Sequence, residues 1–312
     1  MMLSRVAERL YWMARYLERA EDTARLISAY SHLVLDAPSN VEPDWQVPVD
    51  TLDASPLFAK RYRKLDERNV IRFMLADEKN PSSILRSIST ARENVRTTRD
   101  VLPAQAWELV NELHIYVSET AADSLARTPR FSFLESVIAR NQQLNGLIGS
   151  SVTRDHPLWF IKLGQLVERA DMTSRILDTA IGAIGAHQRQ GEVTDVPLLW
   201  GNLLKSLSAT AAYRRLVGPT LIPDEVVDFV LKRRSFPRSI AYCLDGIEET
   251  VSMLKAPAGM LHALRRVLQP IDRYRADIDS PDRLHRLIDS FQAGLGELDD
   301  AIHETWFLPE PQ

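Results

Sequence analysis

The chain contains 312 residues, of which 45% are hydrophobic and 26% charged, and its formal net charge is −4 at pH 7. This composition excludes disordered and fibrous proteins and is typical of a soluble chain that buries a sizeable core. Arginine is abundant, but acidic residues (42) outnumber basic residues (38) overall. The balance of charge therefore argues against a dedicated nucleic-acid binder.

Cysteine content and hydropathy indicate where the protein works. Cys243 is the only cysteine, which leaves no internal disulfide or multi-cysteine metal site and favours a reducing compartment. The longest stretch without Asp, Glu, Lys or Arg is 141–153, too short for the ~20 apolar residues of a membrane span. The N-terminal residues are charged where a signal peptide would be apolar. We therefore expect a cytoplasmic protein that does not associate with a membrane.

Apolar residues recur at three- and four-residue intervals along most of the chain, so we predict an all-α fold. Pro81, Pro157, Pro237 and Pro281 each follow a capping residue and are interpreted as helix starts. The predicted helices span 3–31, 67–77, 81–101, 104–126, 131–152, 157–187, 197–216, 223–232, 237–255, 258–270 and 281–307. The proline-rich stretch 36–58 is predicted to be an irregular surface loop or flap.

The chain is similar to itself at a spacing of 150 to 156 residues. Leu-Glu-Arg-Ala-Glu-Asp-Thr-Ala-Arg from residue 17 aligns with Val-Glu-Arg-Ala-Asp-Met-Thr-Ser-Arg from residue 167. A second match pairs Pro81 with Pro237 and Ser83 with Ser239. We therefore predict two tandem, related helical-bundle repeats in a pseudo-two-fold arrangement. The first repeat spans 1–156, including the loop 36–58, and the second spans 157–312.

The Glu-Arg motif of each repeat lies on a predicted helix. Around Glu168 this helix is apolar nearly all round, because Ile161 and Met172 replace the Tyr11 and Asp22 of the first repeat. A helix of that kind is buried, and buried charges must be paired and hydrogen-bonded.

Two compatible interpretations of the motif follow. In the first, the two helices pack at the pseudo-two-fold axis, and their Glu and Arg side chains cross-pair as buried ion bridges. In the second, the arginines bind a carboxylate or phosphoryl group, while the acids orient them or bind an amino group. The candidate substrate- or partner-binding residues are Arg15, Glu18, Arg19, Asp22, Arg25, Glu168, Arg169, Asp171 and Arg175.

A second polar cluster belongs to the first repeat alone. Arg92, Asn94 and Arg96 align with residues 248–252 of the second repeat, which contain no arginine. If one repeat holds a pocket, this difference favours the first, with these three residues as secondary candidates. The alternative is an ordinary solvated helix face.

Several catalytic devices are absent from the sequence. It contains no Gly-x-x-x-x-Gly-Lys-Ser/Thr, Gly-x-Gly-x-x-Gly, Gly-x-Ser-x-Gly or His-Glu-x-x-His motif. The seven histidines are scattered and are not spaced as metal ligands. We therefore expect no cofactor or metal on this chain itself, and we assign no catalytic residue.

Three separated motifs resemble the bacterial alpha-E family, an all-helical group named for its Glu-Arg motif. They are Tyr-Trp-Met-Ala-Arg-Tyr-Leu-Glu-Arg-Ala-Glu-Asp-Thr-Ala-Arg at 11–25, residues 80–84 with 91–96, and Gly-Gln-Leu-Val-Glu-Arg-Ala-Asp at 164–171. The likeness covers essentially the whole chain, although Met172 stands where an acidic residue is expected. The resemblance implies association with a circularly permuted ATP-grasp protein and a transglutaminase-like peptidase, in systems that make or process small peptides or amides.

The resulting hypothesis is a helical partner of an ATP-grasp amide or peptide ligase. The ligase would hold ATP and Mg, and this chain would position an amino-acid or peptide substrate by charge stabilisation rather than by covalent catalysis. The alternative is a non-catalytic helical scaffold whose Glu/Arg pairs are purely structural.

Overall fold

The computed structural model describes residues 3–36, 44–189, 196–256, 258–277 and 280–308. These residues are predominantly helical and include no β-strand, so the all-α prediction is confirmed. The elements of the first half are α1 (Ser4–Asp36), α2 (Gln46–Thr51), α3 (Ser55–Arg61), α4 (Glu67–Leu75), α5 (Ile84–Arg96), the short 3-10 helix η1 (Arg99–Val101), α6 (Ala104–Thr120) and α7 (Arg127–Ser151). Those of the second half are α8 (His156–Arg189), α9 (Val196–Ser206), α10 (Thr210–Leu216), α11 (Pro223–Lys232), α12 (Ile240–Met253), α13 (Ala258–Arg273) and α14 (Pro281–Trp306).

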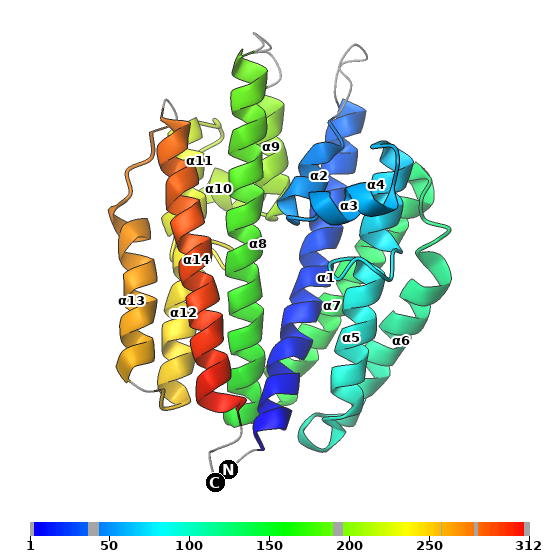
Figure 1. Ribbon diagram of the computed structural model, residues 1–312, viewed down its shortest axis with the longest axis vertical. Coiled ribbons are helices and arrows are strands. Elements are labelled where there is room, and N and C mark those ends of the chain that lie inside the picture. The colour runs from blue at the N-terminus through cyan, green and yellow to red at the C-terminus, as the bar shows by residue number, and fades with distance from the viewer. Residues whose placement is uncertain (1–2, 37–43, 190–195, 257, 278–279, 309–312) are drawn as a thin grey trace.

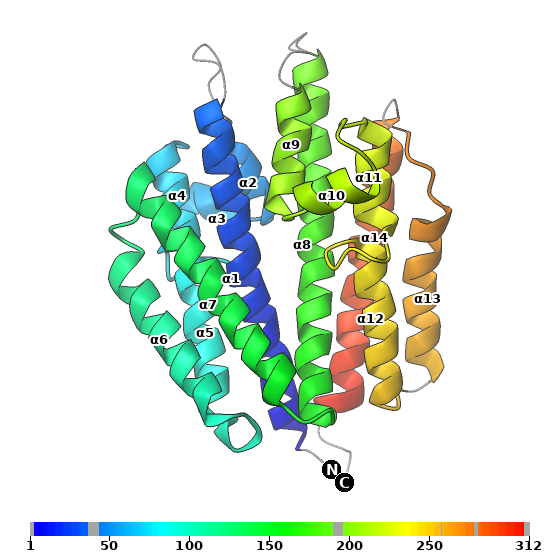
Figure 2. The same cartoon turned by 180° about the vertical axis from the view of Figure 1, so that it is seen from behind.

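The two longest helices, α1 and α8, lie side by side at the centre of the molecule and run in the same direction (Figure 1). On the outer side of α1, α5 and α7 pack against it, and α6 contacts both of them. On the outer side of α8, α12 and α14 pack against it, and α13 contacts both (Figure 2). The core extends along both sides of the α1–α8 contact. No helix of the described ranges combines the length and the apolar character that a bilayer span requires.

Serine caps set the first residues of α5 and α12. The hydroxyls of Ser83 and Ser239 each accept a hydrogen bond from the backbone N–H three residues later, at 3.1 Å in both cases. Each hydroxyl also donates to the carbonyl six residues earlier, at 2.8 and 2.7 Å. Both helices therefore begin after the serine, and the predicted starts at Pro81 and Pro237 are wrong by three residues.

The prediction of an irregular loop over 36–58 is wrong for much of that stretch. Helices α2 and α3 lie within or across it, and Val49 and Phe58 are buried in the core. Pro48 and Pro56 lie in the first turns of these short helices, where no backbone N–H is needed as a helical donor. The prolines therefore start helices here instead of preventing them. Residues 37–43 of the predicted loop fall outside the described residues.

Gly164 sets how closely α1 and α8 approach. A Cβ atom at this position would lie 2.2 Å from the carbonyl oxygen of Tyr11, which belongs to the backbone of the opposite helix. We expect Gly164→Ala to force the helices apart and to lower the free energy of unfolding by about 1–3 kcal/mol. Urea unfolding followed by circular dichroism measures this change.

Gly182→Ala on the same helix is the matched control. A Cβ atom at Gly182 has no neighbour within 4 Å, so alanine is expected to stabilise the helix by up to about 1 kcal/mol. Equal effects of the two substitutions would show that the close approach at Gly164 contributes nothing.

Candidate functional site

The Glu-Arg motifs face each other across the contact between α1 and α8. Glu18 and Glu168 are each only 1% exposed, although both are ionisable. They are placed there because the small residues of the two helices, among them Gly164 and Ala170, allow close packing at the level of the motifs. Carboxylates this deeply buried require charged partners.

Each glutamate is paired with the arginine of the other motif. Arg169 donates to Glu18 from Nε at 2.7 Å and from Nη2 at 2.9 Å. Arg19 donates to Glu168 from Nε and, at 3.0 Å, from Nη2. Both pairs have the forked geometry that makes guanidinium–carboxylate contacts strong. The cross-pairing predicted by the first interpretation is therefore present.

A further residue from each helix supports the opposite glutamate. Arg15 donates from Nε to Glu168 at 2.7 Å, and Gln165, at the aligned position of α8, donates to Glu18 at 3.1 Å. Arg15 also reaches Asp299 of α14 at 2.9 Å, and the Tyr11 hydroxyl donates to the same carboxylate. The cluster thus extends from the two central helices to α14.

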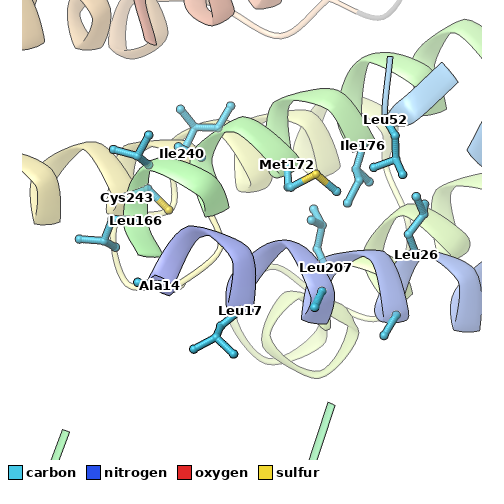
Figure 3. Packing of buried hydrophobic residues seen from close by; sticks show 14 of the residues in the cluster. Ala14, Leu17, Leu26, Leu52, Leu166, Met172, Ile176, Leu207, Ile240 and Cys243 are labelled. Atoms are coloured by element: carbon cyan, nitrogen blue, oxygen red, sulfur yellow. The ribbon is translucent and has the colours of Figure 1, made fainter. Parts of the chain in front are cut away.

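Arg238, in the loop between α11 and α12, completes the site on the other side. Its guanidinium forms an ion pair with Asp22 and contacts Glu21 at 3.1 Å and Glu18 at 3.2 Å. In the internal alignment, Arg238 is aligned with Ser82, and Asp22 is aligned with Met172. Figure 3 shows this methionine projecting from α8 towards α1. Asp22 of the first half therefore pairs with Arg238 of the second half, whereas the two aligned positions, Ser82 and Met172, both lack a charge.

The remaining candidates form pairs within their own helices. Arg25 binds Glu21 through Nη2 at 2.6 Å and through Nε at 3.1 Å. Arg175 binds Asp171 through Nε at 2.9 Å. These i,i+4 pairs continue the charged side of each helix beyond the cross-pairs. Of the nine primary candidates, Arg15, Glu18, Arg19, Glu168 and Arg169 bind one another between α1 and α8, and Asp22 joins them through Arg238.

Three of the buried acids, Glu18, Glu168 and Asp22, differ in how strongly they hold a proton. Burial by itself raises the pKa of Glu18, but Arg169 and Arg238 outweigh it and bring this pKa to about 2. The pKa of Glu168 is also lowered, because Arg19 and Arg15 outweigh its burial. Burial dominates for Asp22, whose pKa rises from 3.8 to about 7.

Asp22 should make stability depend on pH. Its raised pKa means that the folded protein holds this proton more tightly than the unfolded chain, so stability falls as pH rises from about 4 to about 7. We expect Asp22→Asn to remove this part of the slope, as measured by urea midpoints from pH 4 to pH 8. The loss of stability as pH falls from about 4.5, the ordinary pKa of a glutamate, to about 2, the pKa of Glu18 in the folded protein, should remain. An unchanged slope between pH 4 and pH 7 would contradict the assignment.

The secondary candidates make their contacts in another part of the molecule. Arg92 donates to Asn111 of α6 at 2.7 Å and lies 5.0 Å from the centre of the Trp107 ring. Arg96 pairs with Glu93 on the exposed face of α5. The carbonyl of Asn94 caps the end of the same helix. The hydrogen bond of Arg92 thus joins α5 to α6, those of Asn94 and Arg96 stay at α5, and these contacts do not reach the Glu-Arg seam.

The described residues offer few groups for covalent or metal chemistry. Cys243 is fully buried, and burial raises the pKa of its thiol to about 12, so it is a poor nucleophile at neutral pH. Within the described ranges, no group of three or more His, Cys, Asp or Glu residues is placed to hold a metal ion. The seam can hold fixed charges in place, which suits a positioning role or a structural one.

Sequence reasoning missed five residues of the site as candidates, namely Tyr11, Glu21, Gln165, Arg238 and Asp299. Tyr11 and Asp299 are joined across 288 positions of the chain, and no local pattern links them. The internal alignment does point to Arg238, because the positions aligned with Arg238 and with Asp22 have both lost their charge. Such a paired change predicts a contact.

Comparison with known proteins agrees with the motif. The Alpha-E family model, described as a predicted alpha-helical domain with a conserved ER motif, matches residues 2–307. Uncharacterized proteins of Mycobacterium bovis and Mycobacterium tuberculosis are 23% identical over 320 aligned positions, which cover 96% of this chain and 35% of each relative. The chain thus spans about a third of the length of these relatives. No solved structure matches it. Because the family model covers nearly the whole sequence, the chain belongs to the Alpha-E family.

Proposed function

We propose that the halves 1–156 and 157–312 are two copies of one helical unit, related by a pseudo-two-fold axis along the α1–α8 contact. The neighbours α5, α7 and α9 of α1 correspond to α12, α14 and α2 around α8, which supports this arrangement. Asp53 and Ser208, at aligned positions, both have left-handed backbones with φ of 52° and 53°. The twin Glu-Arg motifs would then be a consequence of the duplication.

We further propose that the protein is the helical partner of an ATP-dependent amide or peptide ligase of the ATP-grasp type, working in the cytoplasm. The observation that carries this proposal is the length of the relatives, in which the matching region is 35% of a longer polypeptide. A domain that is fused to further domains in one protein can, in another organism, be a separate chain that binds those domains as partners. The ligase would supply ATP and Mg, and a transglutaminase-like peptidase would act on the product.

The role proposed for this chain is to position an amino-acid or peptide substrate. Fixed charges act best when their own positions are held by packing and hydrogen bonds. The arginines of the seam meet this requirement, since Arg15, Arg19 and Arg169 are each held by a buried carboxylate. The residues of the seam would set the shape and charge of the surface that faces the ligase and its substrate.

A specific observation favours a second candidate, the non-catalytic scaffold. Glu18 and Glu168 use their oxygens on arginines and glutamine of this same chain, so both carboxylates are satisfied without a ligand. In this alternative the seam serves stability alone, and the partner is bound by the outer surface of the bundle.

The two candidates differ in the activity of the complex. The protein is purified from its native host with its partners, and the recovered complex is assayed for ATP hydrolysis that depends on added amino acids. We expect such activity, and we expect it to fall when this chain is removed and to return when it is added back. Recovery of the protein without partners and without amino-acid-dependent ATP hydrolysis would overturn the ligase proposal.

A further inference from the structure

Two pockets flank the seam at aligned positions of the two halves, and their charges are opposite. The first, here called the basic pocket, lies between α1, α7 and α9, and has a volume of about 400 Å³. Its polar and apolar lining includes Arg25, Ser28, His32, Ile138, Lys205 and Ser208. The second lies between α2, α8 and α14, has a volume of about 470 Å³, and its charged lining includes Asp50, Asp178, Asp282 and His285.

The internal alignment shows that these pockets occupy equivalent places. Ser28 aligns with Asp178, and Lys205 aligns with Asp50, at spacings of 150 and 155 residues. Where the basic pocket has a serine from the first half and a lysine from the second, the other pocket has two carboxylates, one from each half. The same fold thus holds a basic lining at one place and an acidic lining at the equivalent place, so the positive charge of the basic pocket is not needed for folding.

Among the primary candidates of the Glu-Arg motifs, Arg25 is the one that lines the basic pocket. Its Nε and Nη2 are held by Glu21, while Nη1 donates to the hydroxyl of Ser208 at the pocket wall. Glu21 also accepts from Arg238, so one carboxylate is shared by two guanidiniums. The wall therefore presents a fixed guanidinium whose charge is only partly neutralised by its acidic neighbour.

Lys205 provides a second positive group on the opposite wall. Its partner Asp36 lies 3.4 Å away, and both side chains are about half exposed (50% and 53%). An exposed pair of this kind contributes little and exchanges readily for another anion. No acidic side chain belongs to the described lining of the pocket. The chemistry of the pocket is thus that of an oxyanion site with one rigid and one mobile donor.

We propose that the basic pocket binds the anionic oxygens of a carboxylate or phosphoryl group, with Arg25, Lys205 and Ser208 as donors. This inference rests on the proposed function and deepens it, because a free amino acid or peptide ends in a carboxylate. The Nη1 side of the Arg25 guanidinium, which Glu21 does not hold, and the point charge of Lys205 suit two oxygens of one group.

The test measures anion binding by this chain alone, without a ligase. Acetate and inorganic phosphate are titrated separately into the ¹⁵N-labelled protein, and the backbone amide shifts of Lys205 and Ser208 are followed. We expect saturable shifts with at least one of the two anions. Tighter binding of acetate would identify a carboxylate as the ligand, and tighter binding of phosphate would identify a phosphoryl group.

Variants assign the binding to the pocket. Lys205→Gln is expected to weaken it about fivefold, which is the size of effect produced by losing one exposed charge contact. Arg25→Lys keeps the charge but cannot both bind Glu21 through a fork and present Nη1 to the pocket, and should weaken anion binding further. Lys64→Gln is the matched control, because Lys64 is also exposed and is 3.6 Å from an aspartate outside the pocket. This control should leave binding unchanged.

Absence of saturation with both anions, or equal losses in Lys205→Gln and Lys64→Gln, would overturn the inference. Its failure is distinct from that of the proposed function, because binding is measured without the partner. A chain that binds acetate but supports no ligase activity overturns the ligase proposal alone. A chain that supports ligase activity without anion binding overturns the pocket alone.

Discussion

Replacing Glu168 by glutamine is expected to lower the free energy of unfolding by about 3–5 kcal/mol. Glu168 accepts hydrogen bonds from both Arg15 and Arg19, and its own side chain is 1% exposed. Glutamine keeps the size of the side chain but removes its charge, so two guanidiniums remain at the seam with one neutral acceptor. The cost comes from these unpaired buried charges rather than from any lost packing.

Urea unfolding followed by circular dichroism measures this loss. Glu93→Gln is the control, because Glu93 pairs with Arg96 on a surface where both side chains are more than half exposed (55% and 51%). That variant should change stability by less than about 1 kcal/mol. A similar small effect in Glu168→Gln would mean that water or rearrangement satisfies both arginines. The cross-pairs would then contribute little to the fold.

Arg238→Ser is expected to cost about 3 kcal/mol or more, and Asp22→Met in the same chain should restore most of it. The single variant leaves Asp22 buried at 2% exposure without its arginine, and one of its oxygens already has no hydrogen-bond partner. The double variant reproduces the serine and methionine found at aligned positions 82 and 172. Glu18 and Glu21 keep Arg169 and Arg25 as partners in either variant.

A double-mutant cycle gives the coupling between the two positions. We expect a coupling energy of about 2 kcal/mol for Asp22 with Arg238, from urea unfolding of the four proteins. The comparison cycle combines Asp22→Met with Arg96→Ser, because Asp22 and Arg96 share no partner. The changes in unfolding free energy of these two variants should add to within about 0.5 kcal/mol. If the effects of the two substitutions in the first cycle are additive, Asp22 and Arg238 are not energetically coupled, and their joint absence at the aligned positions does not indicate a contact.

The burial of the motifs could be inferred before any coordinates because the two halves differ. In α1 the polar residues around Glu18 suggest a solvated stripe, whereas Ile161 and Met172 show that the same position of α8 is surrounded by apolar side chains. Since a charge cannot be buried alone, the pattern favoured cross-pairing between the motifs as one of two interpretations, the other being a bound ligand. Both glutamates are indeed almost fully enclosed.

Helix starts and the stretch 36–58 were harder to predict, for a local reason. Proline was interpreted as the first helical residue at positions 81 and 237, but the serine two residues later closes the turn with its hydroxyl. In 36–58, four prolines suggested an irregular chain, yet Val49 and Phe58 are buried on short helices. Short helices form because tertiary burial stabilises them, and a local pattern carries little of that information.

The amino-acid sequence alone predicts the all-α class, the position of the long helices and the charged residues that must be buried. These follow from periodicity and from the cost of an unpaired charge, which act over a few turns of one helix. Only the tertiary structure decided which groups complete the seam, because Arg238 and Asp299 reach it from a loop and a helix far along the chain. It also decided that Arg25 lines a pocket, since a pocket depends on the placement of three helices at once.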